Sequence, residues 1–250
     1  MNALLTALVA AATSALVAIL SLYLSDRQQQ RREARVQRQE LNSKYLNPLR
    51  FHLVENHFRL LSILDRVGPL DGTNTGVLVV DDPVEVSTKD ASWFIGPGYA
   101  LVSSVYLSSC LFTQLKKVRE DFPYLHLSAA DDTQLAALLL GVQQGFLVKR
   151  GVYYATQPSI GESVWVRDEE RLMTYREFCE KLQDPVWRVW FDRLFMFYLD
   201  IARGEKKQRT ERLLAAMENL SGFLDKCVGG GNSIETRMRA EGVPPHQATS

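Results

Sequence analysis

The chain has 250 residues, a length typical of one domain or of one domain with an accessory segment. Its 29 Lys and Arg residues balance its 29 Asp and Glu residues, which excludes a generally basic nucleic-acid binder and a strongly acidic solvating protein. Hydrophobic residues make up 46% and charged residues 23%, so the composition is that of a chain that buries a core.

The charge is unevenly distributed along the chain. Residues 1–24 carry no charged side chain, whereas residues 25–50 contain seven basic and three acidic residues, a net charge of +4. Residues 51–250 hold the remaining 22 basic and 26 acidic residues, a net charge of −4. An uncharged end, a basic segment and a mildly acidic body therefore follow one another.

The uncharged run Leu4–Leu24 predicts a single transmembrane signal-anchor helix within residues 1–24. As a helix it would be about 31 Å long, enough to cross a hydrocarbon core of roughly 30 Å. A cleaved signal peptide would need a basic residue before the run and a small-residue cleavage site after it, and neither is present. A buried soluble helix is a further alternative, but an apolar surface on all sides is more than such a helix needs.

The basic segment predicts a polar stalk helix over residues 25–47, because residues 26–44 contain no Gly or Pro and are rich in good helix formers. Basic flanks stay on the cytoplasmic side, so we expect the N-terminus outside the cell membrane and the body in the cytoplasm. Its arginines would also attract anionic headgroups of the lipid bilayer. This membrane-surface basic collar consists of Arg27, Arg31, Arg32, Arg35 and Arg38.

Residues 48–228 predict a mainly α, compact helical bundle with two long loops, and residues 229–250 a flexible tail. Helical periodicity begins at Ser43 and continues to Val67, where Gly68-Pro69 ends it. Turn-forming residues then dominate 68–90, the first loop. The apolar residues 77–80 within it indicate at most a short strand or hairpin.

Residues 91–115 contain no charged side chain, so a second membrane span has to be considered. Gly96-Pro97-Gly98 breaks the run, and four serines dilute the remainder. Two spans would also place the basic collar and the cluster Lys116, Lys117 and Arg119 on opposite sides of the membrane. We therefore predict a central buried helix from about Tyr99 to Glu120.

Helix signals define the rest of the body. Ser128, followed by two aspartates, is a predicted N-cap, and Gly151–Arg167 is the second irregular stretch. Thr174 and Glu177 fit a capping box. Asp184-Pro185 opens an aromatic helix that continues to Gly204, and a last helix spans about 206–227. Aromatic side chains with one polar face indicate a core helix rather than a cofactor site.

Catalytic and metal-binding signatures are scarce. His52, Glu55 and His57 resemble a metal site, but His57 lies about 140° around a helix from His52, so the spacing fails. The sequence has no P-loop, nucleophile elbow or dinucleotide fingerprint. The three cysteines are far apart and odd in number, which fits free thiols in a reducing compartment. We accordingly predict no catalytic residue, no metal and no cofactor.

The segment 151–166 is the strongest candidate for a binding loop, because it combines aromatic, amide, hydroxyl and carboxylate groups without a helical period. Its candidate residues are Tyr153, Tyr154, Gln157, Glu162 and Trp165. An alternative is that the aromatic residues simply hold the loop against the core. The turn Gly96-Pro97-Gly98 is the second place to look.

Three hypotheses follow for the function. The first is a membrane-anchored cytoplasmic module that acts as a scaffold, adaptor or regulator, with a protein partner or a second copy of itself. Alanines at every fourth position from Ala3 to Ala15 would allow self-association in the membrane. The second is a membrane-associated enzyme with a site assembled around the 151–166 loop, and a polar pocket that joined His52 or His57 to this loop would favour it. The third is a small-ligand sensor with an apolar cavity beneath the aromatic helix.

Overall fold

The computed structural model describes residues 21–30, 32–33, 36, 39–65, 76–121, 129–147, 151–205, 207–229, 234 and 236–237. The chain divides into two compact units, Met1–Lys44 and Tyr45–Ser250. In the first unit, residues 21–30 are helical and exposed. Most of the predicted transmembrane segment, residues 1–20, lies outside the described residues. Within the described residues, no helix is both long and apolar enough to cross a bilayer.

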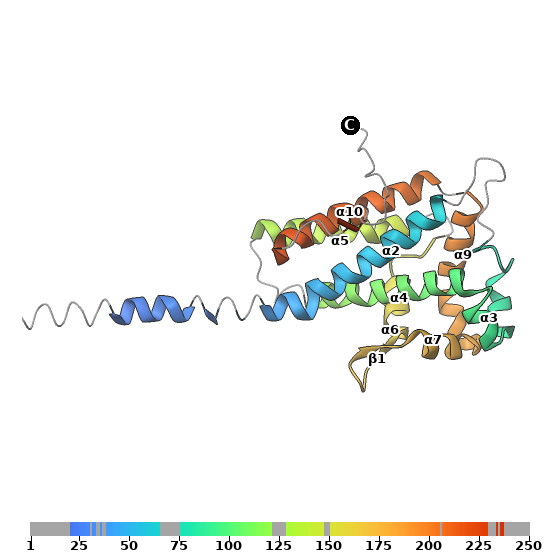
Figure 1. Ribbon diagram of the computed structural model, residues 1–250, viewed down its shortest axis with the longest axis horizontal. Coiled ribbons are helices and arrows are strands. Elements are labelled where there is room, and N and C mark those ends of the chain that lie inside the picture. The colour runs from blue at the N-terminus through green and yellow to red at the C-terminus, as the bar shows by residue number, and fades with distance from the viewer. Residues whose placement is uncertain are drawn as a thin grey trace, which may run out of the picture. The chain divides into compact units, whose positions relative to one another are not determined.

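The second unit is a mainly helical bundle, as the sequence predicts. Its long helices are α2 (Asn47–Asp65), α4 (Tyr99–Glu120), α5 (Ala129–Phe146) and α10 (Lys207–Val228). Helix α10 packs along α5 and α2, and α2 lies between α10 and α4 (Figure 1). Helix α4 also contacts two shorter helices, α6 (Thr156–Ser163) and α9 (Asp192–Ala202). It therefore occupies the middle of the bundle.

The predicted central helix is confirmed, with the expected bounds Tyr99–Glu120. Its buried serines do not leave polar atoms unsatisfied, because Ser108 donates to Asn56 Oδ1 and the other three hydroxyls donate to carbonyls one turn earlier. Ser104 Oγ donates to Ala100 O at 2.6 Å, and Ser109 Oγ donates to Val105 O at 2.8 Å. This explains how an uncharged segment with four serines forms the centre of a protein core.

The helix predicted from Ser43 begins differently, because a π-helical turn (Asn42–Leu46) directly precedes α2. The sequence allows a short strand or hairpin over residues 77–80. The structure describes residues 76–80 of this loop, and none of them forms a strand. Val77 and Val80 are nevertheless buried. The 3-10 helix η2 (Pro83–Thr88) follows, opened by an Asp82–Glu85 capping box. A short helix, α3 (Ala91–Ile95), then begins after its N-cap Asp90.

The prediction that Gly151–Arg167 is irregular is wrong, because the segment contains α6 and the first strand of a hairpin. Strand β1 (Trp165–Val166) pairs antiparallel with β2 (Arg171–Leu172). Helix α6 has a sequence of weak helix formers, TQPSIGES, and lacks a side-chain cap. Burial of Ile160 and Gly161 against the bundle stabilises it, so tertiary packing outweighs local propensity here.

The next elements begin where the sequence predicts. Thr174 and Glu177 form the capping box of α7 (Tyr175–Leu182). Asp184 caps α8 (Pro185–Arg188), whose Pro185 occupies the first turn. However, the single helix predicted from here to Gly204 is divided into α8, the 3-10 helix η4 (Val189–Phe191) and α9. At this break the rings of Trp187 and Phe191 lie 4.5 Å apart between centroids.

The last helix, α10, ends at Val228 and is followed by Gly229, whose φ of +77° suits a glycine after a helix C-terminus. The predicted tail 229–250 contains a few described residues. Ile234 is buried, and Arg237 forms an ion pair with Glu55 and lies over the ring of Phe58, with its guanidinium carbon 4.4 Å from the centroid. This part of the segment is therefore packed against α2.

Candidate functional site

The last turn of α4 carries a cluster of cations that contact the segment 151–166. Lys116 Nζ lies 2.6 Å from a carboxylate oxygen of Glu120 and 3.1 Å from one of Glu162. Burial acts to lower the pKa of Lys116, but the two carboxylates outweigh it and the pKa is raised. Lys116 is therefore a fixed positive charge that joins α4 to the end of α6.

The other two cations of this turn lie over aromatic rings of the same segment. Lys117 Nζ lies 3.0 Å from the ring centroid of Trp165, and the guanidinium carbon of Arg119 lies 4.8 Å from that of Tyr154. Both are cation–π contacts, and cations at a helix C-terminus also interact favourably with the helix dipole. These contacts hold the candidate segment against one end of α4.

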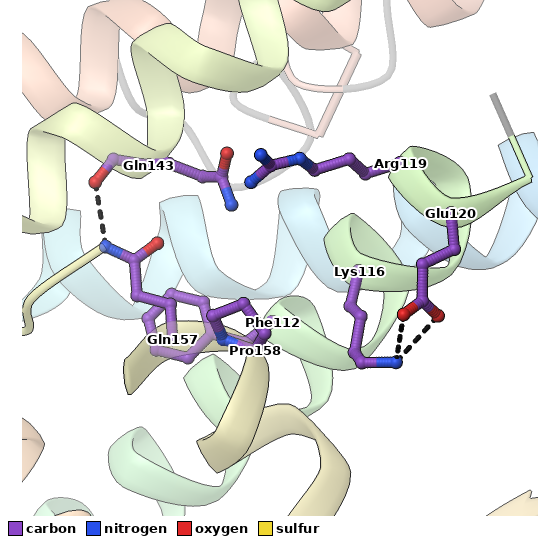
Figure 2. Close-up of a pocket in the computed structure, with 7 residues that line it drawn as sticks. All are labelled: Phe112, Lys116, Arg119, Glu120, Gln143, Gln157 and Pro158. Atoms are coloured by element: carbon purple, nitrogen blue, oxygen red, sulfur yellow. Dashed lines mark hydrogen bonds and ion pairs between the residues drawn. The ribbon is translucent and has the colours of Figure 1, made fainter. Parts of the chain in front are cut away.

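A cavity of about 230 Å3 opens beside this cluster, between α4, α5 and α6 (Figure 2). Two apolar side chains form one side of it, and charged or amide groups form the rest (Figure 2). The lining residues are Phe112, Lys116, Arg119, Glu120, Gln143, Gln157 and Pro158.

Gln157 is the most buried polar residue of this lining, with 1% of its surface exposed. Its Nε2 donates to the carbonyl oxygens of Gln143 and Val152, at 2.9 and 3.1 Å. These two acceptors fix the orientation of the amide, because only its nitrogen can donate to them. The opposite atom, Oε1, is buried and has no hydrogen-bond partner in the part of the chain that the structure describes. Figure 2 shows this oxygen turned toward the cavity.

The guanidinium of Arg119, which is exposed, faces the side-chain amide of the buried Gln143 (Figure 2). Among the described residues, Arg119 has its ring contact with Tyr154 and no carboxylate within ion-pair distance. Its planar group of N–H donors is well suited to a carboxylate or another planar anion. The cavity thus combines a buried acceptor with an exposed cationic donor.

The structure places four of the five predicted binding residues at this end of α4. Tyr154, Glu162 and Trp165 contact its cations, and Gln157 lines the cavity. Tyr153 belongs elsewhere, because its ring lies beside α9 under Arg193, with 5.2 Å between the guanidinium carbon and the centroid. The alternative expectation, that aromatic residues hold the segment in place, therefore describes Tyr154 and Trp165 well.

Sequence reasoning missed the contributions of α4 and α5 to the cavity. In the sequence, Lys116 and Arg119 bear only on membrane orientation, and no pattern marks Gln143. A basic cluster at a helix C-terminus was the available signal. The second candidate place, Gly96-Pro97-Gly98, has a packing role, since a Cβ on Gly98 would lie 2.3 Å from the ring of Trp93.

The histidines of α2 lie apart from the cavity lining. His57 is fully buried, and its Nε2 lies 2.9 Å from Glu218 Oε1. Burial lowers the pKa of His52 to about 4, against a raising effect of Glu55. In the described part of the chain, no group of three or more His, Cys, Asp or Glu side chains is placed to hold a metal ion.

The basic collar belongs to the first unit, where its residues are partly described. Arg27 lies over the ring of Tyr23, with 5.1 Å from the guanidinium carbon to the centroid, and Arg32 is exposed on a helix. Arg31, Arg35 and Arg38 lie outside the described residues. Their role at a membrane surface stays a prediction.

Comparison of the chain with protein-family models, with curated proteins and with solved structures gives no match, so the site geometry and the sequence carry the functional argument.

Proposed function

We propose that this chain is a single-pass membrane protein whose helical domain acts in the cytoplasm as a binding, scaffold or regulatory module. The uncharged residues 1–24 would anchor it with the N-terminus outside, and the basic residues of 25–50 would lie on the cytoplasmic surface. Its partners would be the lipid bilayer and a protein or a second copy of the chain. Nucleic acid is not among them, since the body is mildly acidic.

One observation carries the binding role: a polar cavity at the end of α4 contains a buried acceptor, Gln157 Oε1, that no group among the described residues satisfies. Nearly all buried polar atoms in folded proteins have a partner, and exceptions call for a specific explanation. A bound molecule that donates a hydrogen bond supplies that explanation. Concave sites with a few convergent polar groups are the usual form of a binding site.

The lining supports binding more than catalysis. An enzyme built around 151–166 with His52 or His57 would need one of these imidazoles in the site. Both histidines are on α2, whereas the cavity is lined by α4, α5 and α6. The amine of Lys116 is held in its charged form by Glu120 and Glu162, so it is unsuited to act as a base or nucleophile.

Membrane attachment is tested on the full-length chain by alkaline carbonate extraction. We expect the protein to remain in the membrane pellet. A matched variant, Ala12→Arg with Leu16→Arg, places two charges in the middle of the uncharged run, and each costs about 2.5–3.5 kcal/mol at a bilayer centre. This variant should move to the supernatant. Extraction of both forms would contradict the anchor.

Orientation and binding need separate measurements. A reporter that is active only in the cytoplasm, fused after Ser250, should be active, and a silent reporter would contradict the proposed orientation.

Affinity capture of the full-length chain from membranes should then recover a stable partner or a second copy. A protein that remains monomeric and without a partner in this experiment would contradict the scaffold role.

A further inference from the structure

The buried oxygen of Gln157 defines what the occupant of the cavity must offer. A carboxamide oxygen is only an acceptor, and its own nitrogen is already committed to the carbonyls of Gln143 and Val152. The occupant must therefore carry an N–H or O–H donor. A purely accepting anion would leave Gln157 Oε1 unsatisfied and would add repulsion between two acceptors.

The charges around the cavity define the occupant's net charge. Lys116 and Arg119 contribute two positive charges to the lining and Glu120 contributes one negative charge, while Glu162, outside the lining, pairs with Lys116. The carboxylates of Glu120 and Glu162 lie within 3.1 Å of Lys116 and offset its charge, so Arg119 is the cation that can face a single anionic group and a multiply charged anion is not favoured here. A ligand with one positive and one negative group matches this balance.

The hydrogen-bond donors and the hydrogen-bond acceptor of the site lie at different places. The exposed Arg119 offers guanidinium N–H donors, and the buried Gln157 offers an acceptor at a different point of the lining (Figure 2). A carboxylate is the natural partner of the first, and an ammonium group is the natural partner of the second. The intervening apolar surface of Phe112 and Pro158 suits a short hydrocarbon portion.

The cavity volume limits the size of the ligand. At about 230 Å3 it is smaller than the roughly 300–1,000 Å3 typical of sites for drug-sized molecules. It therefore suits a molecule with few non-hydrogen atoms. A compact molecule that carries both a carboxylate and an ammonium group is of the α-amino-acid class.

We propose that the cavity between α4, α5 and α6 binds a free α-amino acid, whose carboxylate accepts from Arg119 and whose ammonium donates to Gln157 Oε1. This rests on the proposed binding function and names the ligand class of the same site. It would make the domain a sensor whose contact between α4 and the 151–166 segment responds to a small metabolite. Arg119 also stacks on Tyr154, so an occupant at its guanidinium would act directly on that segment.

The test is isothermal titration of the full-length chain in mild detergent with each of the 20 common L-amino acids. We expect saturable binding of at least one of them. Its methyl ester, which lacks the negative charge, and its N-acetyl derivative, which lacks the positive charge, should each bind at least roughly tenfold more weakly. Inorganic phosphate is the competing probe, and phosphate that binds more tightly than every amino acid would overturn the proposal.

Variants connect the binding to this cavity. Arg119→Gln, a change at an exposed position, should weaken binding of the best amino acid by roughly tenfold or more. Arg176→Gln is the matched control, because Arg176 is 89% exposed on α7 and pairs with Glu180 rather than with the cavity. Unchanged affinity in Arg119→Gln, or an equal loss in Arg176→Gln, would overturn the assignment.

Gln157→Met tests the deeper contact, and circular dichroism establishes whether that variant is folded. If it is folded, it should lose amino-acid binding while Arg176→Gln retains it. If it is unfolded, the Arg119→Gln result decides alone. Failure of all amino acids to bind would overturn the ligand class, whereas the carbonate extraction and partner capture would still report separately on the proposed membrane-bound scaffold.

Discussion

Gly161 lies directly against the backbone of Thr113, where α6 crosses α4. Thr113 Oγ1 donates to Gly161 O at 2.8 Å, and a Cβ on Gly161 would lie 2.6 Å from Thr113 N. Real Cβ atoms do not approach backbone atoms so closely, so the contact requires glycine. Because α6 also carries Gln157, the position of the buried acceptor depends on this close approach of two helices.

Replacing Gly161 with alanine should therefore destabilise the protein. The added methyl group would push α6 away from α4 and disturb the bond from Thr113. We expect the free energy of unfolding to fall by roughly 1–3 kcal/mol, as for other over-packed sites. Urea unfolding followed by circular dichroism measures this change through the transition midpoint.

Gly222 provides the matched control for this substitution. It lies in α10, and a Cβ at this position would meet no atom of the described residues within 4 Å. Gly222→Ala should raise the free energy of unfolding by about 0.4–1 kcal/mol, because alanine loses less backbone entropy in a helix. Similar effects of the two substitutions would contradict the close-contact explanation.

A second prediction concerns the buried hydrogen bonds that join α2, α4 and α9. Ser108 Oγ donates to Asn56 Oδ1 at 2.7 Å and lies 2.6 Å from the hydroxyl oxygen of Tyr198. Because Asn56 Oδ1 can only accept, Ser108 uses its proton there and Tyr198 donates to Ser108. Ser108 is thus the central member of the network.

Removing the central member should cost more than removing the terminal one. Tyr198→Phe deletes one hydrogen bond and should lower the free energy of unfolding by about 1 kcal/mol. Ser108→Ala leaves Asn56 Oδ1 and the Tyr198 hydroxyl without this partner, so a loss of roughly 2–3 kcal/mol is expected. In the double variant the two losses should not add. Additive losses would show that the two bonds are independent.

Local signals in the sequence were sufficient to locate most helix ends. The caps at Thr174 and Asp184 and the glycine ends at Gly204 and Gly229 depend on neighbouring residues only, and the structure has all four. The central helix was predictable for a related reason, since its charge-free length and the basic residues after it define both its burial and its end.

The elements that depend on distant contacts were not predictable in this way. Helix α6 has poor intrinsic propensity and forms because Gly161 and Ile160 pack against α4. The candidate site was likewise predictable only in its local part. The composition of 151–166 indicates Gln157 and Glu162. Arg119 and Gln143 come from α4 and α5, and one sequence does not show that these helices meet.

A third prediction follows from the lowered pKa of His52. Burial reduces this pKa to about 4, against 6.5 for an ordinary histidine, so the unfolded chain binds the proton more readily than the folded one. The resulting stability is fully present above pH 6.5 and is lost as the pH falls toward 4. We expect this effect to contribute on the order of 1–3 kcal/mol to the free energy of unfolding. Glu55 acts in the opposite direction, because its charge favours protonated His52.

Comparison of urea midpoints at pH 7.5 and 4.5, for the wild type and His52→Gln, isolates this contribution. The variant has no group to titrate at this position, so its stability should fall less between the two pH values. His57, which is also buried and faces Glu218, is the same in both proteins. An identical fall in both proteins would contradict the role of His52.

A fourth prediction concerns the three thiols, all of which lie in the described part of the chain and form no disulfide. Burial raises the pKa of Cys110 to about 12 and that of Cys179 to about 11. Cys227 is half-buried near the end of α10. Because the thiolate is the reactive form, iodoacetamide at pH 8 should modify Cys110 and Cys179 at least about 100-fold more slowly than an ordinary thiol.

Mass spectrometry of the alkylated peptides at successive times measures these rates. Cys227 should be modified first, and Cys227→Ser should remove the fast phase while leaving the slow reactions unchanged. In 8 M urea the burial is lost, so all three thiols should react at similar rates. Phe178 of α7 packs against Phe191, with 5.2 Å between the ring centroids, and this packing keeps α7 in place. Fast modification of Cys179 in the folded protein would mean that α7 separates from these aromatic side chains.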